Sequence, residues 1–477
     1  MRKINRKFYI WSFIALMFIT SCNKFKDFGD ANENPSDISD PVASAFLTST
    51  LANISSTTLT SGIYVQYFME SQYPGTCYYE DNSASFTGYY SGVLNYLQQI
   101  IDLGSSGTTN NMVQVAKILQ QYIYLQLTDQ WGDLPYTEAL QGASNTKPVY
   151  DEQETIYEGV ISTIRASVDS MDETTISGDI TDYDGDVDSW KKLGNSIIML
   201  AAIQMSKVYP SASGYAATAF NAALSSSAGY ISSNDENFAI TFPSTTFPDP
   251  WYTLYYSRQD YGESETLTDL MSSLNDTRQD LFGGASNTAG STTSSSIGLP
   301  YGVTRAEIVS FIATYSGWAR ILRGDFREAT SSIALINAAY ITLVRAEAAN
   351  LGWTSEDVST LYEDGIQISF DYWGATMPST YMSQDSVALG SDDDEKIAIQ
   401  QYIAVYPNGL YAWNIWRKTG YPTLTPSENA ANESGDIPRR IKYSTTEATT
   451  NPDNYAAAVA RLTGGNSDVA RIWWDVE

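Results

Sequence analysis

The stretch that decides the fold lies at residues 127–139 and reads Leu-Thr-Asp-Gln-Trp-Gly-Asp-Leu-Pro-Tyr-Thr-Glu-Ala. Before it, apolar side chains recur at spacings of three and four between Met112 and Thr128, which is the period of a helix with one apolar face. Gly132 can end that helix with a positive φ, and Pro135 cannot continue it. The stretch therefore predicts a long amphipathic helix that closes in a tight turn.

Outward from this stretch, helical patterns dominate a body that begins near Ala43. Amphipathic segments span residues 151–172, 189–208, 333–351, 355–373, 392–406 and 454–463. Small residues such as Ala346 and Ala349 allow neighbouring helices to approach closely, whereas strand-like alternation is scarce. The sequence therefore predicts a mainly α fold of paired helices that resembles tetratricopeptide packing, although no clear 34-residue repeat is present.

The composition changes between residues 229 and 330. Pro243, Pro248 and Pro250 lie there among many Gly and Ser residues and clustered aromatic rings. Such segments form loops on a rigid scaffold, where binding residues are frequent. We therefore expect a single helical domain over residues 43–477, with an irregular, loop-rich ligand face in 229–330.

The first residues have the pattern of an export signal. Basic residues precede an apolar run over 8–19, which is shorter than the roughly 20 residues that span a bilayer. The run ends in Ile-Thr-Ser-Cys at 19–22, which fits the bacterial lipobox. Residues 1–21 are therefore predicted to be removed and Cys22 to be acylated, with residues 22–42 as a polar tether.

The composition excludes several classes of function. The net charge of −28 argues against nucleic acid and anionic polymers as ligands, because both require a positive surface. Histidine is absent, which removes the commonest general base and the commonest metal ligand. Cys22 and Cys77 are the two cysteines, so acylation of Cys22 leaves no intramolecular disulfide.

The stretch at 127–139 resembles a block of the SusD/RagB family of Bacteroidetes outer-membrane lipoproteins. Six further blocks agree with that family in order: Pro148–Tyr157, Trp190–Met199, Val344–Ala349, Ala412–Pro422, Ile437–Tyr443 and Trp473–Asp475. Together they extend over nearly the whole chain that follows the signal. Their tryptophans Trp131, Trp413 and Trp416 are expected to pack in the core, so these blocks identify the fold and do not mark the ligand.

The resemblance implies a lipid-anchored, cell-surface protein that covers a TonB-dependent, SusC-like outer-membrane transporter. Members of the family bind glycans in many cases and peptides in others, and they carry out no chemistry. The resemblance also implies that the acylated Cys22 contacts outer-membrane lipid and that the protein needs no cofactor. The aromatic arc of the starch-binding archetype cannot be aligned with the loops of this sequence.

Aromatic residues outside the predicted helices are the candidates for a ligand site, because flat rings dock sugar faces and apolar side chains at low entropic cost. Three clusters qualify: Tyr73, Tyr78 and Tyr79 with Glu80, Asp81 and Asn82; Trp251, Tyr252, Tyr255 and Tyr256 with Arg258 and Asp260; and Tyr301, Tyr315 and Trp318 with Arg320. For each single ring the alternative is packing against the body, since 34 Tyr and 11 Trp cannot all face a ligand.

An acidic run at residues 182–188 suggests a metal site. Asp182, Asp184, Asp186 and Asp188 alternate around a Gly, as at the start of a calcium loop, but Leu193 stands where the bidentate Glu is expected. The alternative is a polar turn in which Asp188 or Ser189 caps a helix from Trp190.

The sequence leaves three hypotheses for function. The first is glycan capture for a transporter, and the second is the same role for a peptide or other cargo. The third is a surface glycoside hydrolase, which needs a carboxylate pair roughly 5–10 Å apart. The chain has 55 acidic residues, so no single pair stands out, and we expect no enzyme.

Overall fold

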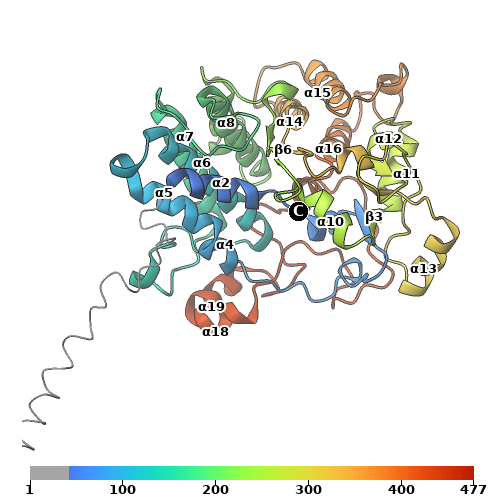
Figure 1. The fold of residues 1–477 in the computed structure, drawn as a ribbon, viewed down its shortest axis with the longest axis horizontal. Helices are drawn as coiled ribbons and strands as arrows, with labels where there is room; N and C mark the ends of the chain where they lie inside the picture. Colours follow the sequence, from blue (N-terminus) through green and yellow to red (C-terminus); the bar gives the residue numbers. More distant parts are fainter. Residues whose placement is uncertain (1–41) are drawn as a thin grey trace, which may run out of the picture. The chain divides into compact units, whose positions relative to one another are not determined.

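The structure is a computed structural model that describes residues 42–477. The predicted signal and Cys22 lie outside this range. Residues Ala43–Glu477 cluster as one compact unit. In it, helices that follow one another in the sequence pack together, which confirms a mainly α fold of paired helices (Figure 1).

The helices fall into two main groups. The first contains α2 (Ala43–Ile54), α5 (Val93–Gly107), α6 (Asn110–Trp131), α7 (Gln153–Ser170), α8 (Val187–Gln204) and α9 (Tyr215–Leu224). The second contains α14 (Ala338–Asn350), α15 (Val358–Trp373), α16 (Asp393–Ala404) and α17 (Gly409–Thr419), and it includes the short α3 (Leu59–Tyr64), which packs on α17. Contacts between α8 and α14 join the two groups.

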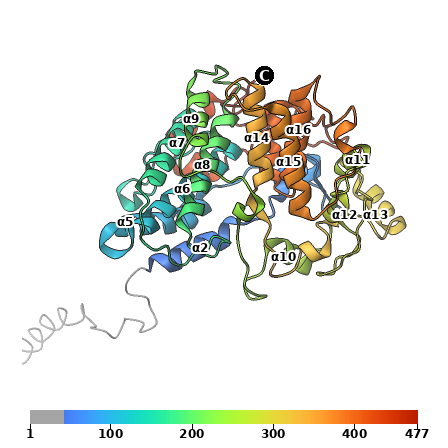
Figure 2. The same cartoon turned by 90° about the horizontal axis from the view of Figure 1, so that it is seen from above.

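Shorter elements connect and flank these groups. The remaining helices are α4 (Thr87–Ser91), α10 (Pro250–Ser257), α11 (Glu265–Ser273), α12 (Gln279–Phe282), α13 (Arg305–Thr314), α18 (Thr445–Thr450) and α19 (Pro452–Arg461). Both views place α11–α13 on the far side of α14–α16 from α5–α7 (Figure 1, Figure 2). The segment expected to be loop-rich thus contains short helices joined by loops.

Three small antiparallel ladders join residues that are distant in the sequence. They pair β1 (Phe68–Glu70) with β3 (Tyr261–Glu263), β2 (Phe238–Ala239) with β6 (Ala334–Ile336), and β4 (Gly283–Gly284) with β5 (Arg320–Ile321). Each strand has only two or three residues, so no alternating pattern could reveal it in the sequence.

Most predicted helix positions are confirmed, and one start is wrong. The stretch at 127–139 does end a helix: α6 stops at Trp131, and Gly132 follows with a φ of 88°. The helix expected from residue 333 begins only at Ala338, because residues 334–336 form β6. Asn337 then starts the helix by accepting the backbone N–H of Tyr340 at 2.8 Å.

Four of the sequence blocks that carry the family resemblance meet around one buried carboxylate, that of Asp129. It accepts hydrogen bonds from Tyr157 Oη at 2.5 Å and from Asn414 Nδ2 at 2.6 Å. Trp474 Nε1 donates to the same group at 2.9 Å. Burial raises the pKa of Asp129, and the Tyr157 hydrogen bond opposes that rise. Four blocks distant in sequence are thus joined at one point.

The tryptophans of these blocks are buried, as expected. Trp131, Trp413 and Trp416 are each no more than 9% exposed. Trp413 Nε1 donates to the carbonyl of Pro438 at 2.9 Å, and Arg440 Nη2 donates to that of Trp131 at 3.0 Å. The tryptophans of these blocks therefore help to build the core.

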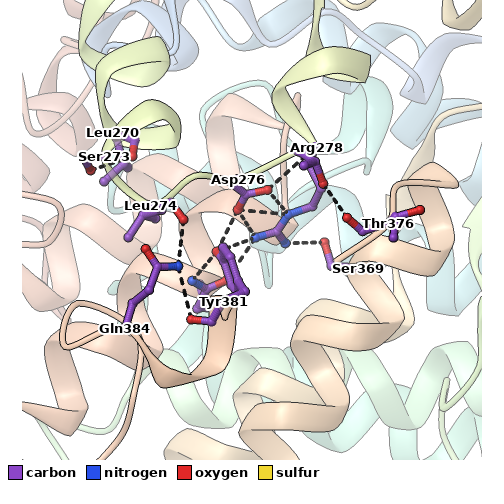
Figure 3. Close-up of polar contacts among 11 residues, drawn as sticks. Leu270, Ser273, Leu274, Asp276, Arg278, Ser369, Thr376, Tyr381 and Gln384 are labelled. Carbon is purple, nitrogen blue, oxygen red and sulfur yellow. Dashed lines mark hydrogen bonds and ion pairs between the residues drawn. The ribbon is translucent and has the colours of Figure 1, made fainter. Parts of the chain in front are cut away.

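A second buried network fastens the segment of α11 and α12 to the second helical group (Figure 3). The side chains of Arg278 and Asp276 are completely buried and form an ion pair at 2.5 Å. Arg278 also donates to Ser369 Oγ at 2.8 Å, and Tyr381 Oη donates to Asp276 at 2.7 Å. Ser369 belongs to α15, so the pair links two separate parts of the fold.

Candidate functional site

The short helix α10 presents a pair of stacked tyrosines. Asp249 accepts the backbone N–H groups of Trp251 at 2.8 Å and Tyr252 at 3.1 Å, and Pro250 occupies the first turn, where its missing N–H has no cost. Tyr252 and Tyr256 therefore lie one turn apart, with ring centres separated by 6.1 Å and planes inclined by 20°. The Tyr256 side chain is 80% exposed.

A hollow of about 220 Å³ lies beside this pair. Its lining consists of Tyr252, Tyr255, Tyr256, Gln259, Asn287, Ala289 and Arg327. Asn287 Nδ2 donates to Gln259 Oε1 at 2.9 Å, and Arg320 Nε donates to Asn287 Oδ1 at 2.9 Å. Two amides held in fixed positions next to flat rings can hydrogen-bond a hydroxyl-rich ligand.

Arg327 is buried beneath the hollow, where it supports the tyrosines. Its guanidinium carbon lies 4.1 Å from the centre of the Tyr255 ring. Its Nη2 donates to the carbonyl of Ser286 at 2.7 Å, and its Nε donates to that of Leu322 at 2.8 Å. Burial lowers the pKa of Arg327. Its donors are used by the protein backbone, so we assign it a supporting role.

Arg258 connects the first and second aromatic clusters. Its guanidinium carbon lies 5.3 Å from the centre of the Tyr73 ring and 5.1 Å from that of Tyr261. It forms ion pairs with Glu70 and, at 2.7 Å, with Asp260. Burial raises the pKa of Glu70, although the nearby Arg258 opposes this shift. Tyr73 is 65% exposed, so a second ring is held at the surface.

Contacts between residues 72–78 and 303–305 bring the third cluster to the same region. Tyr78 Oη donates to the carbonyl of Val303 at 2.7 Å, and Arg305 Nε donates to that of Gln72 at 2.9 Å. Tyr315, at the end of α13, is 47% exposed and packs on Phe311 with ring centres 4.7 Å apart. These contacts link the loop of the first cluster to the segment that leads into α13, and we call the exposed or partly exposed rings of the three clusters, Tyr73, Tyr78, Tyr252, Tyr256 and Tyr315, the tyrosine face.

Several predicted ligand residues are buried or partly buried against the body of the protein. Trp251, Tyr255 and Trp318 are each 4% exposed, and Tyr79 is 1% exposed. Tyr301 is partly buried and donates through Oη to the carbonyl of Ile63 at 2.8 Å. Packing against the body uses most of the surface of these five rings, and Tyr255 also lines the hollow.

Asp81 and Asn82 face a different part of the chain. Asp81 forms an ion pair with Lys442 at 2.6 Å, and Asn82 Nδ2 donates to the carbonyl of Arg440 at 3.0 Å. Both residues thus tie their loop to the C-terminal segment. The hollow instead includes Gln259, Asn287 and Arg327, which are not among the residues predicted from the sequence. Single polar residues in a Gly- and Ser-rich tract gave no signal that could identify them.

The acidic run at 182–188 forms a turn that starts a helix. Asp186 caps α8 by accepting the N–H of Ser189 at 2.7 Å, which corrects the expectation of a cap at Asp188 or Ser189. Asp182 accepts from Thr241 Oγ1 at 2.6 Å, and Asp184 has a φ of 48°. Within residues 42–477, no group of three or more acidic or Cys side chains is placed to hold a metal ion. The structure therefore gives the calcium alternative no support.

Comparison with known proteins identifies the family. A family model described as "Starch-binding associating with outer membrane" matches residues 35–444. The chain belongs to the SusD-like family. Among functionally curated proteins, none matches it. In the part of the chain that the structure describes, no helix is both long enough and apolar enough to cross a bilayer.

Solved structures agree with this SusD-like assignment. A chitin-binding protein matches with a TM-score of 0.78 and 26% identity over 91% of this chain and 100% of its own. A SusD homologue from Bacteroides uniformis matches with a TM-score of 0.79 and 22% identity over 91% of this chain and 99% of its own. A chitin-binding SusD homologue from Flavobacterium johnsoniae matches with a TM-score of 0.78 and 22% identity over the same shares, 91% and 99%.

Proposed function

We propose that this SusD-like protein captures a glycan at the cell surface and passes it to a TonB-dependent outer-membrane transporter. The observation that carries the proposal is the match of residues 35–444 to a family described as starch-binding and associated with the outer membrane. One structural relative that is 26% identical is a chitin-binding protein, which also supports a carbohydrate ligand.

The tyrosine face supports the same proposal through its chemistry. Tyr252 and Tyr256 offer a stacking surface for sugar rings, and Gln259 and Asn287 offer amides for their hydroxyl groups. Each stacked ring adds about 0.5–1.5 kcal/mol beyond its buried area. A dissociation constant of 1 mM corresponds to about −4 kcal/mol, so a few rings give weak binding. Weak binding suits a protein that must release its cargo to a pore.

Capture without catalysis fits the composition. The chain has no histidine, and its family is one of binding proteins. Attachment through an acylated Cys22 would hold the body at the membrane without a spanning helix, because several acyl chains together anchor a protein stably.

Calorimetric titration of the mature chain with a panel of neutral oligosaccharides, including malto- and chito-oligosaccharides, tests the proposal. We expect at least one glycan to bind and to be recovered intact. Binding of peptides with no response to any glycan would contradict glycan capture and favour the same delivery role with a peptide as cargo. Release of shortened sugars by the purified chain would contradict capture without catalysis.

Attachment and partnership need a separate experiment in the native bacterium. We expect mass spectrometry to find the mature N-terminus at Cys22 with acyl chains attached. Cys22→Ala should release the protein from the outer-membrane fraction, and a transporter should co-purify with the wild-type chain. An unacylated mature N-terminus would contradict the anchor, and the absence of any outer-membrane partner would contradict the delivery step.

A further inference from the structure

A second cavity lies in the helical part of the molecule, apart from the hollow beside Tyr252 and Tyr256. Its volume is about 210 Å³. It is lined by the end of α2, the loop at 55–58, α3, the C-terminal part of α6 and residues 407–413. Trp251 also lines it, so α10 contributes to both the cavity and the hollow.

The lining of this cavity contains no Asp, Glu, Lys or Arg among the residues that the structure describes. This is unusual in a chain with 55 acidic and 27 basic residues. A charged ligand group enclosed here would lose its hydration and find no counter-ion, which is costly. The cavity therefore suits an uncharged ligand.

The cavity combines an apolar wall with a polar rim. Leu335, Leu410 and the Trp251 indole form part of the wall. Ser55 and Thr60 lie on the rim, and neither hydroxyl has a hydrogen-bond partner within residues 42–477. The Trp251 indole N–H likewise has no partner among the described residues, although Trp251 is only 4% exposed. These donors are available to a molecule with an apolar face and hydroxyl edges.

The walls of the cavity are held in place before any ligand arrives. Thr58 Oγ1 accepts the N–H of Gly409 at 2.9 Å, and Asn408 Oδ1 accepts that of Leu410 at 3.2 Å. A Cβ at Gly409 would lie 2.3 Å from the backbone nitrogen of Gly62, so α3 and α17 are in direct backbone contact. A preformed cavity binds at a lower entropic cost than one that must be ordered.

We propose that this cavity is a second binding site that takes one uncharged pyranose ring. A pyranose has the apolar face and hydroxyl edges that the wall and the rim complement. The proposal rests on the glycan-binding function proposed above and adds a site separate from the tyrosine face. The wild-type chain is then expected to bind two molecules of a short neutral sugar.

Filling the cavity tests the proposal. Ser55→Trp places an indole at the rim, and Thr57→Trp is its matched control because Thr57 is in the same loop and does not line the cavity. The probes are maltotriose and the trimer of N-acetylglucosamine, titrated by calorimetry. We expect Ser55→Trp to bind one molecule where the wild type and Thr57→Trp bind two. The remaining site should keep its affinity within about twofold, as for independent sites.

The outcomes separate this proposal from the proposed function. If the wild type binds one molecule, and binding is unchanged in Ser55→Trp but weakened in Tyr256→Ala, the cavity site is wrong and glycan capture stands. If neither probe nor any other glycan binds the wild type, both proposals fail. Thermal melting verifies folding of each variant, and Thr60→Trp, which fills the rim from an exposed position on α3, replaces Ser55→Trp if the latter unfolds.

Discussion

At the scale of single residues, the side chains that define the family and those that we propose to face a ligand are different sets. Asp129, Tyr157, Asn414 and Trp474 belong to the conspicuous sequence blocks and are buried in one network. The exposed rings and amides of the hollow lie outside those blocks. Substitutions in the two sets should therefore have separable effects, on stability for the first and on binding for the second.

Gln259→Ala tests the polar part of the hollow. Gln259 is exposed and accepts one hydrogen bond, from Asn287. Removal of the Gln259 side chain should therefore leave the melting temperature unchanged. We expect glycan affinity to fall about two- to tenfold, which corresponds to one ordinary hydrogen bond. Gln367→Ala is the matched control, because Gln367 is an exposed glutamine on α15 with one side-chain hydrogen bond, to Asp371. Equal affinities in the two variants would remove Gln259 from the site.

Glu263 predicts a dependence of stability on pH. Burial raises its pKa to about 8, against hydrogen bonds from Gln279 and Tyr406 that favour the ionised form. Because the folded chain binds the Glu263 proton more tightly than the unfolded chain, protonation of Glu263 stabilises the fold, and this contribution is complete below the unfolded-state pKa of 4.5. The contribution is lost as the pH rises through the folded-state pKa of about 8. The free energy of unfolding should therefore fall between pH 5 and pH 8.

In Glu263→Gln, the fall in the free energy of unfolding between pH 5 and pH 8 should be smaller by about 2–4 kcal/mol. Denaturant unfolding at both pH values measures this difference. The Gln279 amide can turn to accommodate the new NH₂ group, because its Oε1 has no partner in the described structure. Asp249, whose pKa burial raises to about 7, would still give a smaller slope of the same sign. An unchanged slope in Glu263→Gln would contradict the assignment.

At the scale of elements, α10 shows how local sequence positions the tyrosine pair. The Asp-Pro sequence at 249–250 starts the helix, and the four-residue spacing of Tyr252 and Tyr256 stacks their rings. The helix has only eight residues, so its start contributes much of its order. Loss of the cap should therefore affect binding as well as stability.

Asp249→Ala should lower the free energy of unfolding by about 1 kcal/mol and also weaken glycan binding. Asp357→Ala is the matched control: Asp357 caps α15 by accepting the N–H of Thr360 at 2.8 Å, and α15 does not line the hollow. We expect that variant to lose a similar stability and to keep its affinity. Unchanged affinity in Asp249→Ala would show that the tyrosines do not depend on the cap.

The same elements show what sequence could and could not predict. Long helices such as α6 and α7 were predictable because their apolar period extends over several turns. The face around α10 was only partly predictable. Its clusters of rings were visible, but their burial depends on ladders of two or three residues and on contacts such as that between Asn287 and Gln259, 28 residues apart. Sequence proximity carries no information about such contacts.

At the scale of the whole molecule, a buried polar network attaches the segment of α11 and α12 to the second helical group. The network of Arg278 and Asp276 joins the α11–α12 segment to α15 (Figure 3). The guanidinium carbon of Arg278 also lies 4.3 Å from the centre of the Phe370 ring. Removal of one partner would leave the other charge buried and unpaired, which costs more than the pair contributes.

Arg278→Leu should therefore lower the free energy of unfolding by about 3–5 kcal/mol. Arg323→Leu is the matched control, since Arg323 pairs with Asp325 at 2.7 Å but both side chains remain partly exposed. That variant should lose no more than about 1 kcal/mol. Chemical denaturation of the two variants measures both values, and equal losses would contradict a special role for the buried pair.

The central claim is that the rings on α10 bind a glycan while the family motifs build the scaffold. Its most direct test is the affinity of the double variant Tyr252→Ala/Tyr256→Ala for the panel glycan that the wild type binds most tightly. We predict affinity about 5- to 150-fold weaker, with an unchanged melting temperature, and wild-type affinity for Tyr215→Ala, an exposed ring on α9. Wild-type affinity in the double variant would contradict the claim.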